Sequence, residues 1–328
     1  MKKITMIGFG SWGIAMACVL AKNGHNVTMW EPNEKLAAML DKERVNERSL
    51  PGIVIPSSIC ITADVDLACQ SDVVIMALSS KQVTDVMPII VPKLRDGVIL
   101  ASASKGLIES RQMRITEYLA ELAPNCKIAC FSGPSHAEEV SRNMPTAVTA
   151  ASICEQTAQK LQDVFSNENF RVYTSNDIVG VELGGVLKNV IALAAGMSDG
   201  LGYGDNTKAA MMTRGMAEIA RLGVAMGANI YTFAGLSGIG DLIVTCTSRH
   251  SRNWRGGNLL AQGKDVSTVL AEVNMAVEGI NTAKTVLALA EKYNVKMPIV
   301  EEINKVLYEG KDPKTVVKDL MNRDLIAE

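Results

Sequence analysis

A single lysine, Lys188, lies in the most apolar stretch of the second half of the chain. Aliphatic residues surround it on nearly every helical face of segment 179–193, which predicts a buried helix. A buried lysine must reach water, pair with a carboxylate or serve a site, and burial lowers the pKa of its ammonium toward the range useful for proton transfer. Asp241, in GLSGIGDLIVTC, is a carboxylate that could orient this lysine, and its alternative role is a helix cap.

A basic turn at residues 248–255, SRHSRNWR, has the composition of an anion site. It combines three arginines with Ser251 and Asn253 just ahead of a predicted helix. Arginine forks and the amides of a helix N-terminus both favour phosphate. A solvent-exposed basic turn without a ligand is the alternative that the pattern leaves open.

Three glycines near the start of the chain, Gly8, Gly10 and Gly13, predict a dinucleotide site. They follow an apolar run at 4–7 and open a helix that ends at Asn23-Gly24, and a second strand at 27–30 ends at Glu31. In such a unit the first glycine permits the tight turn, the second admits a pyrophosphate, and the third lets the helix pack on the strand. Glu31, roughly 20 residues further on, can accept hydrogen bonds from the hydroxyls of an adenosine ribose.

Two later strand-to-helix loops also carry polar groups, and such loops bind the ligands of open α/β sheets. Lys105 follows the strand predicted at 98–102, where it either meets a ligand or remains a solvated loop lysine. Ser135, in SGPSHA after the strand at 127–131, is predicted to cap a helix whose amides face the same edge.

Strands and helices alternate up to residue 175 and predict a doubly wound, largely parallel sheet. Beyond that point strand signals nearly vanish, so we expect an all-helical second domain. The predicted domains are a dinucleotide-binding domain at 1–175 and a helical substrate and catalytic domain at 176–328. Within the first domain, further strands are expected at 59–62, 72–78, 98–102, 127–131, 147–150 and 170–173, and helices at 34–42, 83–94 with a kink or break at Pro88, and 113–122.

The composition fits a soluble α/β enzyme with an aliphatic core, since 48% of the 328 residues are hydrophobic and only 4% aromatic. A net charge of −2 gives no general attraction to nucleic acid or an anionic membrane. Seven cysteines without a CxxC pair indicate a reducing cytosol, and no Cys/His spacing predicts a metal site. The first residues superficially resemble a signal peptide, but the nucleotide-binding unit explains their glycines, so we expect a cytoplasmic protein without a membrane segment.

Seven motifs together, in this order, resemble the bacterial NAD(P)-dependent glycerol-3-phosphate dehydrogenases over essentially the whole chain: GFGSWG, ASASKG, SGPSHAEE, GVLKNVIALAAG, GIGDLIVTC, SRHSRNWRGG and AVEG. The resemblance implies a Rossmann-type N-terminal domain and a homodimer. It implies hydride transfer between NAD(P)H and dihydroxyacetone phosphate, giving sn-glycerol 3-phosphate for phospholipid synthesis. In this scheme Lys188 is the general acid/base and Asp241 its partner.

The resemblance, together with the glycine loop and the basic turn, defines two sets of site residues, and no metal is expected. The substrate set is Lys105, Gly133, Ser135, Lys188, Asp241, Ser251, Arg252 and Asn253. The cofactor set is Gly8, Gly10, Ser11, Trp12, Gly13, Glu31, Lys105, Ala137, Arg252 and Glu278.

Glu31 departs from the family pattern. Many bacterial members carry an arginine or histidine near the end of the second strand, suited to a 2′-phosphate, whereas Glu31 would repel that group. We therefore expect a preference for NADH, with NADPH as the alternative cofactor. Two other functions compete: another β-hydroxyacid-type Rossmann dehydrogenase acting on a different small anionic substrate, and a nucleotide-sensing protein without turnover.

Overall fold

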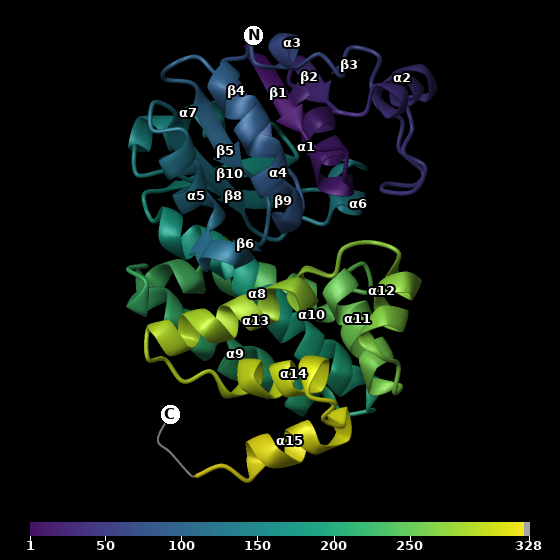
Figure 1. Ribbon diagram of the computed structural model, residues 1–328, viewed down its shortest axis with the longest axis vertical. Coiled ribbons are helices and arrows are strands. Elements are labelled where there is room, and N and C mark those ends of the chain that lie inside the picture. Colours follow the sequence, from purple (N-terminus) through teal and green to yellow (C-terminus); the bar gives the residue numbers. More distant parts are fainter. Residues whose placement is uncertain (325–328) are drawn as a thin grey trace. The chain divides into compact units, whose positions relative to one another are not determined.

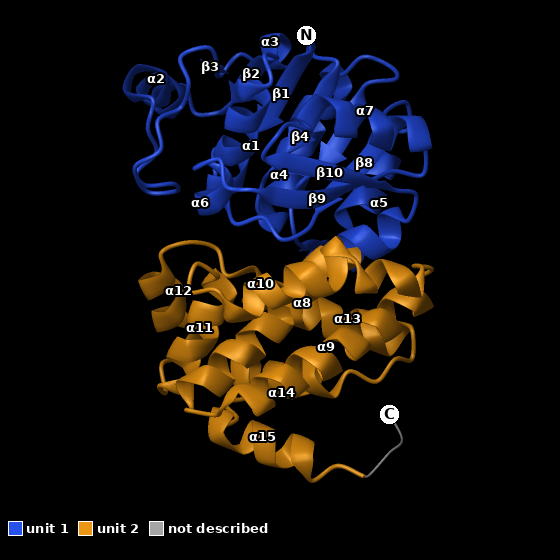
Figure 2. Ribbon diagram, turned by 180° about the vertical axis from the view of Figure 1, so that it is seen from behind, with its two compact units in different colours: residues 1–182 blue, residues 183–328 orange. Residues whose placement is uncertain are grey.

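The computed structural model describes residues 1–324, which belong to two compact units, Met1–Glu182 and Leu183–Glu328 (Figure 2). The division falls inside helix α8 (Ile178–Gly200), a few residues beyond the position expected from the end of strand signals. The C-terminal part of α8 therefore belongs to the second unit, and its first residues belong to the first.

The first unit is built on an eight-stranded sheet, which confirms the predicted doubly wound, largely parallel architecture (Figure 1). The strand order is β10-β9-β8-β5-β4-β1-β2-β3, and every neighbouring pair is parallel except β8 with β9. Since β1 lies between β2 and β4, the chain reverses its direction of winding beside β1, where open sheets bind their ligands. The strands are β1 Lys3–Ile7, β2 Asn26–Trp30, β3 Cys60–Thr62, β4 Val73–Met76, β5 Ile99–Ser102, β8 Lys127–Ser132, β9 Thr146–Ala151 and β10 Phe170–Ser175.

Alternating strand residues feed two separate hydrophobic cores, because successive side chains of a strand point to opposite faces of the sheet. In β4, Val73 and Ile75 join one core, and Val74 and Met76 join the other. Burial on both faces explains why these strands read as continuous apolar runs. The helices of the unit are α1 Ser11–Lys22, α2 Glu34–Glu43, α3 Val65–Ala68, α4 Ser80–Ile90, α5 Ile115–Leu122, α6 Ala137–Val140 and α7 Glu155–Phe165.

Two predicted helices have different bounds from those expected. Helix α4 begins at Ser80 rather than 83, because the Ser79 amide donates to Gln82 Oε1 (3.2 Å) and closes the first turn; it continues through Pro88 to Ile90. A 3₁₀ turn, Val91–Lys93, follows it. The segment predicted as a helix from 113 starts with a short strand, β7 (Met113–Arg114), paired with β6 (Leu107–Ile108), and α5 begins after it.

A buried acid fixes the first turns of α8 within the first unit. Glu182 accepts hydrogen bonds from the Thr116 amide (3.0 Å) and from Arg114 Nη1 (2.9 Å) at the start of α5. Burial raises the pKa of the Glu182 carboxyl, while the Arg114 charge opposes that shift. The helix that carries Lys188 is therefore anchored at its beginning by an ion pair inside the protein.

The second unit is helical throughout its described residues, as predicted. Helix α8 is long and apolar enough to cross a membrane, but 94% of its most apolar window is buried inside the protein, as in the central helix of a globular domain. The other elements are α9 Asp205–Ala225, a 3₁₀ turn Ile230–Ala234, a π turn Leu236–Gly240, α10 Asp241–Thr247, α11 Arg252–Ala261, α12 Val266–Val273, α13 Glu278–Lys292, α14 Pro298–Tyr308 and α15 Pro313–Met321.

Candidate active site

Lys188 and Asp241 form a buried ion pair, which is one of the alternatives that the sequence left open for a lysine inside an apolar helix. The Lys188 side chain is 5% exposed and that of Asp241 is 1% exposed. Lys188 Nζ donates to Asp241 Oδ1 and also to Thr245 Oγ1 (2.6 Å), and the Thr245 hydroxyl donates to the Asp241 carbonyl (2.6 Å). A protonated amine is thus kept out of bulk water by a carboxylate and a hydroxyl that take the place of its hydration shell.

Close backbone packing places Asp241 against α8. A Cβ on Gly184 would lie 2.3 Å from the Ser237 carbonyl oxygen, and a Cβ on Gly238 would lie 2.1 Å from that of Phe233. Only glycine permits such an approach, so the π turn Leu236–Gly240 lies directly on α8. Asp241 is the first residue of α10, and its carboxylate accepts from Lys188 rather than capping its own helix.

The basic turn leads into α11, and its residues are tied to the same part of α8. Asn253 Nδ2 donates to Asn189 Oδ1 (2.9 Å), and Asn253 Oδ1 accepts from the Gly279 amide at the start of α13 (2.8 Å). Because Asn189 follows Lys188 in the chain, this bond links the proposed phosphate-binding turn to the helical turn of the ion pair. Arg252 is the first residue of α11 and is partly buried.

Ser251 caps α11: its hydroxyl accepts from the Trp254 amide at 3.2 Å. This finding gives Ser251 a structural role in addition to the substrate contact predicted from the basic turn. Two polar residues of the site, Thr245 and Asn189, were not among the sequence candidates. Their signals were position alone, one helical turn after Asp241 and one residue after Lys188, and neither spacing distinguishes a site residue from an ordinary helical one.

Glycines hold α8 and α11 at backbone contact. A Cβ on Gly196 would lie 2.0 Å from the Trp254 carbonyl oxygen, and a Cβ on Gly257 would lie 2.0 Å from that of Leu193. At the end of this seam Trp254 Nε1 donates to Asp199 Oδ2 (2.7 Å). The geometry between Lys188 and the start of α11 is therefore set by rigid, interlocked backbone.

In the first unit, three predicted substrate residues come together at one carbonyl. Lys105 Nζ (3.2 Å) and Ser135 Oγ (2.9 Å) both donate to the Gly133 oxygen. Gly133 has a φ of +142°, and a Cβ there would lie 2.9 Å from Val148 Cα, so the position requires glycine. The expectation that Ser135 caps the next helix is wrong, because His136 is at the N-cap of α6 and the Ser135 hydroxyl turns back to Gly133.

The glycine loop has the geometry that a dinucleotide requires. Gly8 has a φ of +112°, and a Cβ on Gly13 would lie 2.2 Å from the Gly8 oxygen, so α1 packs tightly on β1. A Cβ on Gly10 meets nothing within 4 Å, which leaves open space before the first amides of α1, beginning at Ser11. Trp12 Nε1 is buried and has no hydrogen-bond partner. Open space, helix amides and an unsatisfied donor fit a pyrophosphate-containing cofactor.

The remaining cofactor candidates lie at element ends. Glu31 directly follows β2, its amide donates to the Thr62 carbonyl (3.0 Å), and its carboxylate accepts from the Asn33 amide (3.1 Å). Ala137 is the first residue of α6, and Glu278 is the first residue of α13. The end of β2 is where the sequence predicted a ribose-binding carboxylate.

No group of three His, Cys, Asp or Glu residues that could hold a metal ion is found within residues 1–324. Cys246, on the same helix as Asp241, is no nucleophile, because burial raises the pKa of its thiol to about 12.

A doubly wound nucleotide-binding unit, joined by one helix to an all-helical unit with a buried lysine–aspartate pair, defines a two-domain nicotinamide-dependent dehydrogenase class. Residues 3–158 match the model of the NAD-dependent glycerol-3-phosphate dehydrogenase N-terminus, and residues 177–318 match that of its C-terminus. The chain belongs to the NAD-dependent glycerol-3-phosphate dehydrogenase family.

Curated bacterial relatives support this assignment over nearly the full chain. The glycerol-3-phosphate dehydrogenase [NAD(P)+] of Agathobacter rectalis is 49% identical over 325 residues, covering 99% of this chain and 97% of the relative. That of Bacillus subtilis is 49% identical over 327 residues, covering 98% and 95%. The crystal structure of glycerol-3-phosphate dehydrogenase from Coxiella burnetii superposes with a TM-score of 0.94 at 35% identity and covers 98% of this chain and 99% of that one.

Proposed function

We propose that this enzyme interconverts dihydroxyacetone phosphate and sn-glycerol 3-phosphate, as a cytoplasmic homodimer that supplies glycerol 3-phosphate for phospholipid synthesis. The observation that carries the proposal is the buried Lys188 amine, held by Asp241 and Thr245 in a chain of this family. Such an amine is suited to give a proton to an oxygen on which negative charge develops.

The chemistry divides between the cofactor and the protein. A bound reduced nicotinamide supplies the hydride that reaches the carbonyl carbon of the substrate. As charge grows on the carbonyl oxygen, Lys188 Nζ delivers a proton to it, and in the reverse direction it takes that proton back. Asp241 stabilises the ammonium before transfer, and the Thr245 hydroxyl fixes the direction of the amine. Positioned proton transfer of this kind contributes about 10²- to 10⁴-fold to the rate.

Arg252 and Asn253 are proposed to hold the substrate phosphate at the start of α11, where guanidinium and helix amides add their attraction. Binding energy from this remote group fixes the reacting carbon relative to Lys188. Lys105, Gly133 and Ser135 are proposed to contact the substrate, and Lys105 also the cofactor.

Two substitutions at Lys188 test the proposed activity. Lys188→Arg keeps a cation beside Asp241 but gives up its proton only above pH 12, so kcat for NADH oxidation with dihydroxyacetone phosphate should fall by about 10²-fold or more. The kcat of Lys188→Met should fall as far. This variant also leaves Asp241 buried and unpaired, so its free energy of unfolding should be lower by about 3–5 kcal/mol. NADH binding, followed by its fluorescence, should persist in the arginine variant. An arginine variant as active as the parent would rule out Lys188 as the proton donor.

A dehydrogenase acting on a different anionic substrate is the chief alternative. The requirement for a phosphate group on the substrate distinguishes the two functions. Arg252→Ala should raise KM for dihydroxyacetone phosphate by about 10²-fold, through loss of a charge-assisted contact, and leave KM for unphosphorylated dihydroxyacetone nearly unchanged. Arg255 lies on the exposed face of the same helix, so Arg255→Ala is the matched control and should alter neither of the two KM values. Equal effects on both ketones would favour another substrate, and no turnover by the parent with any ketone would favour a nucleotide sensor.

A further inference from the structure

The second unit contains a cavity of about 660 Å³ that the proposed reaction does not use. It runs along one face of α9 and is closed by the residues before α14, the start of α14, and α15. Its lining on α9 extends from Thr207 to Arg221, which at 1.5 Å per residue is about 21 Å. This volume is within the roughly 300–1,000 Å³ of small-molecule pockets.

Apolar and basic side chains both line this groove. Met211, near the start of α9, lines the groove together with Val317 and Leu320 of α15. Further along α9, Arg221 Nη2 donates to the Lys296 carbonyl (3.1 Å), which ties the residues before α14 to α9; both Arg221 and Lys296 line the groove.

Two further arginines, Arg214 and Arg323, complete the basic lining. The lining contains one acid, Glu218, and its carboxylate is occupied by the amides of Ile299 (2.9 Å) and Val300 (3.4 Å). Four cations against one engaged carboxylate make the groove electropositive, so it favours an anionic group.

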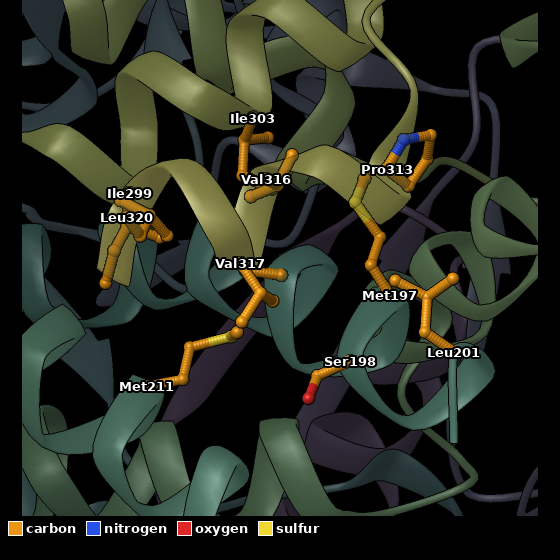
Figure 3. Close-up of a pocket in the computed structure, with 11 residues that line it drawn as sticks. Met197, Ser198, Leu201, Met211, Ile299, Ile303, Pro313, Val316, Val317 and Leu320 are labelled. Carbon is orange, nitrogen blue, oxygen red and sulfur yellow. The ribbon is translucent and has the colours of Figure 1, made fainter. Parts of the chain in front are cut away.

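A small void lies behind part of the apolar lining of the groove. Met211, Ile299, Val317 and Leu320 also line this void of about 10 Å³, and Figure 3 shows them with Ser198 among the residues around it. The Ser198 hydroxyl is buried and has no hydrogen-bond partner.

We propose that this groove binds the monomeric anion of a long-chain fatty acid, with the hydrocarbon chain along Met211, Val317 and Leu320 and the carboxylate beside Arg221 and Lys296. A groove that combines apolar side chains with cations matches a linear hydrocarbon chain with one anionic head. A protein partner fits less well, because among the large hydrophobic residues that line the groove only Met321 is exposed, whereas stable protein interfaces bury about 800 Å² on each side.

The experiment is isothermal titration of the full chain with octanoate, decanoate and dodecanoate, all below their micelle concentrations. We expect one site per chain and an affinity that rises about tenfold with each two added carbons. Dodecyltrimethylammonium has the same tail with a cationic head and should bind at least about 100-fold more weakly. Vesicles of anionic phospholipid, added without fatty acid, should not retain the chain in a sedimentation assay, because the site takes a single free chain.

Variants test the location of the site without touching the catalytic residues. The double variant Arg221→Glu and Lys296→Glu should weaken dodecanoate binding about 100-fold, and Leu320→Glu should weaken it by a similar factor, whereas Lys160→Glu, an exposed residue of α7, should leave it unchanged. Both groove variants should retain the parent's circular dichroism spectrum and NADH affinity.

Three results would overturn the proposal: no saturable binding of dodecanoate, equal binding of the two head groups, or equal binding by the parent and the groove variants. A chain that is dimeric by light scattering and becomes monomeric with Leu320→Glu would instead assign the groove to an interface between two copies.

Discussion

Lys188 illustrates how one charged residue is tolerated inside an apolar helix. Removing an ammonium from water without compensation costs several kcal/mol, and here a carboxylate and a hydroxyl supply the compensation. In the proposed reaction, the same arrangement would keep the proton donor in one place before the substrate arrives, so less reorganisation would be needed. The ion pair is therefore better explained by catalysis than by stability, since buried pairs are often no better than apolar packing for stability.

Glu31 allows a prediction about cofactor choice at the level of one side chain. Its carboxylate at the end of β2 should accept from the ribose hydroxyls of NADH and repel a 2′-phosphate, so kcat/KM should be at least about tenfold higher with NADH than with NADPH. Glu31→Gln should lower the ratio of kcat/KM with NADH to kcat/KM with NADPH. Glu34→Gln, an exposed acid in the first turn of α2, should leave it unchanged. Steady-state assays with both cofactors decide the matter, and an NADPH advantage in the parent would contradict the prediction.

At the level of elements, the glycine seam between α8 and α11 sets how far the phosphate-binding turn lies from Lys188. Gly257→Ala would place a methyl group 2.0 Å from the Leu193 carbonyl oxygen, so the helices must separate. We expect a loss of about 3 kcal/mol in the free energy of unfolding and a fall of about 100-fold in kcat/KM, because small misplacements of catalytic groups are costly.

Gly204→Ala is the matched control for the seam. Gly204 has an extended backbone, and a Cβ there meets nothing within 4 Å, so stability should change by less than about 1 kcal/mol. Urea unfolding and steady-state kinetics measure both quantities. If Gly257→Ala matched this control in both, the seam would not set the site geometry.

Element by element, the sequence predicted what depends on local pattern and missed what depends on tertiary contact. The strands, the helix closed by Asn23 and the buried position of Lys188 follow from apolar periodicity and turn residues. The turn of Ser135 back to Gly133 does not, because it depends on a glycine held against Val148 of another strand. Thr245 and Asn189 were not predicted as site residues because their roles arise only when α10 and α11 pack on α8.

At the level of the whole molecule, one buried acid outside the proposed active site should make stability depend on pH. Glu218 is 3% exposed, and burial raises the pKa of its carboxyl to about 7 from 4.5, although the Ile299 and Val300 amides and Arg221 oppose the shift. Between these two values the folded chain holds a proton that the unfolded chain has released. The free energy of unfolding contributed by this group therefore falls as pH rises from about 4.5 to about 7, by about 3 kcal/mol at most.

Glu218→Gln should remove this dependence, because its amide oxygen still accepts from the start of α14 but does not titrate. The free energy of unfolding of the variant, measured with urea relative to that of the parent, should rise by about 2–3 kcal/mol from pH 5 to pH 8. Glu291 is an exposed acid on α13, and Glu291→Gln is the control for the loss of one charge. Its free energy of unfolding should match that of the parent at every pH. Identical pH profiles for the parent and Glu218→Gln would mean that Glu218 is already ionised in the folded chain near pH 5. The two α14 amides and Arg221 would then outweigh the cost of burying the carboxylate.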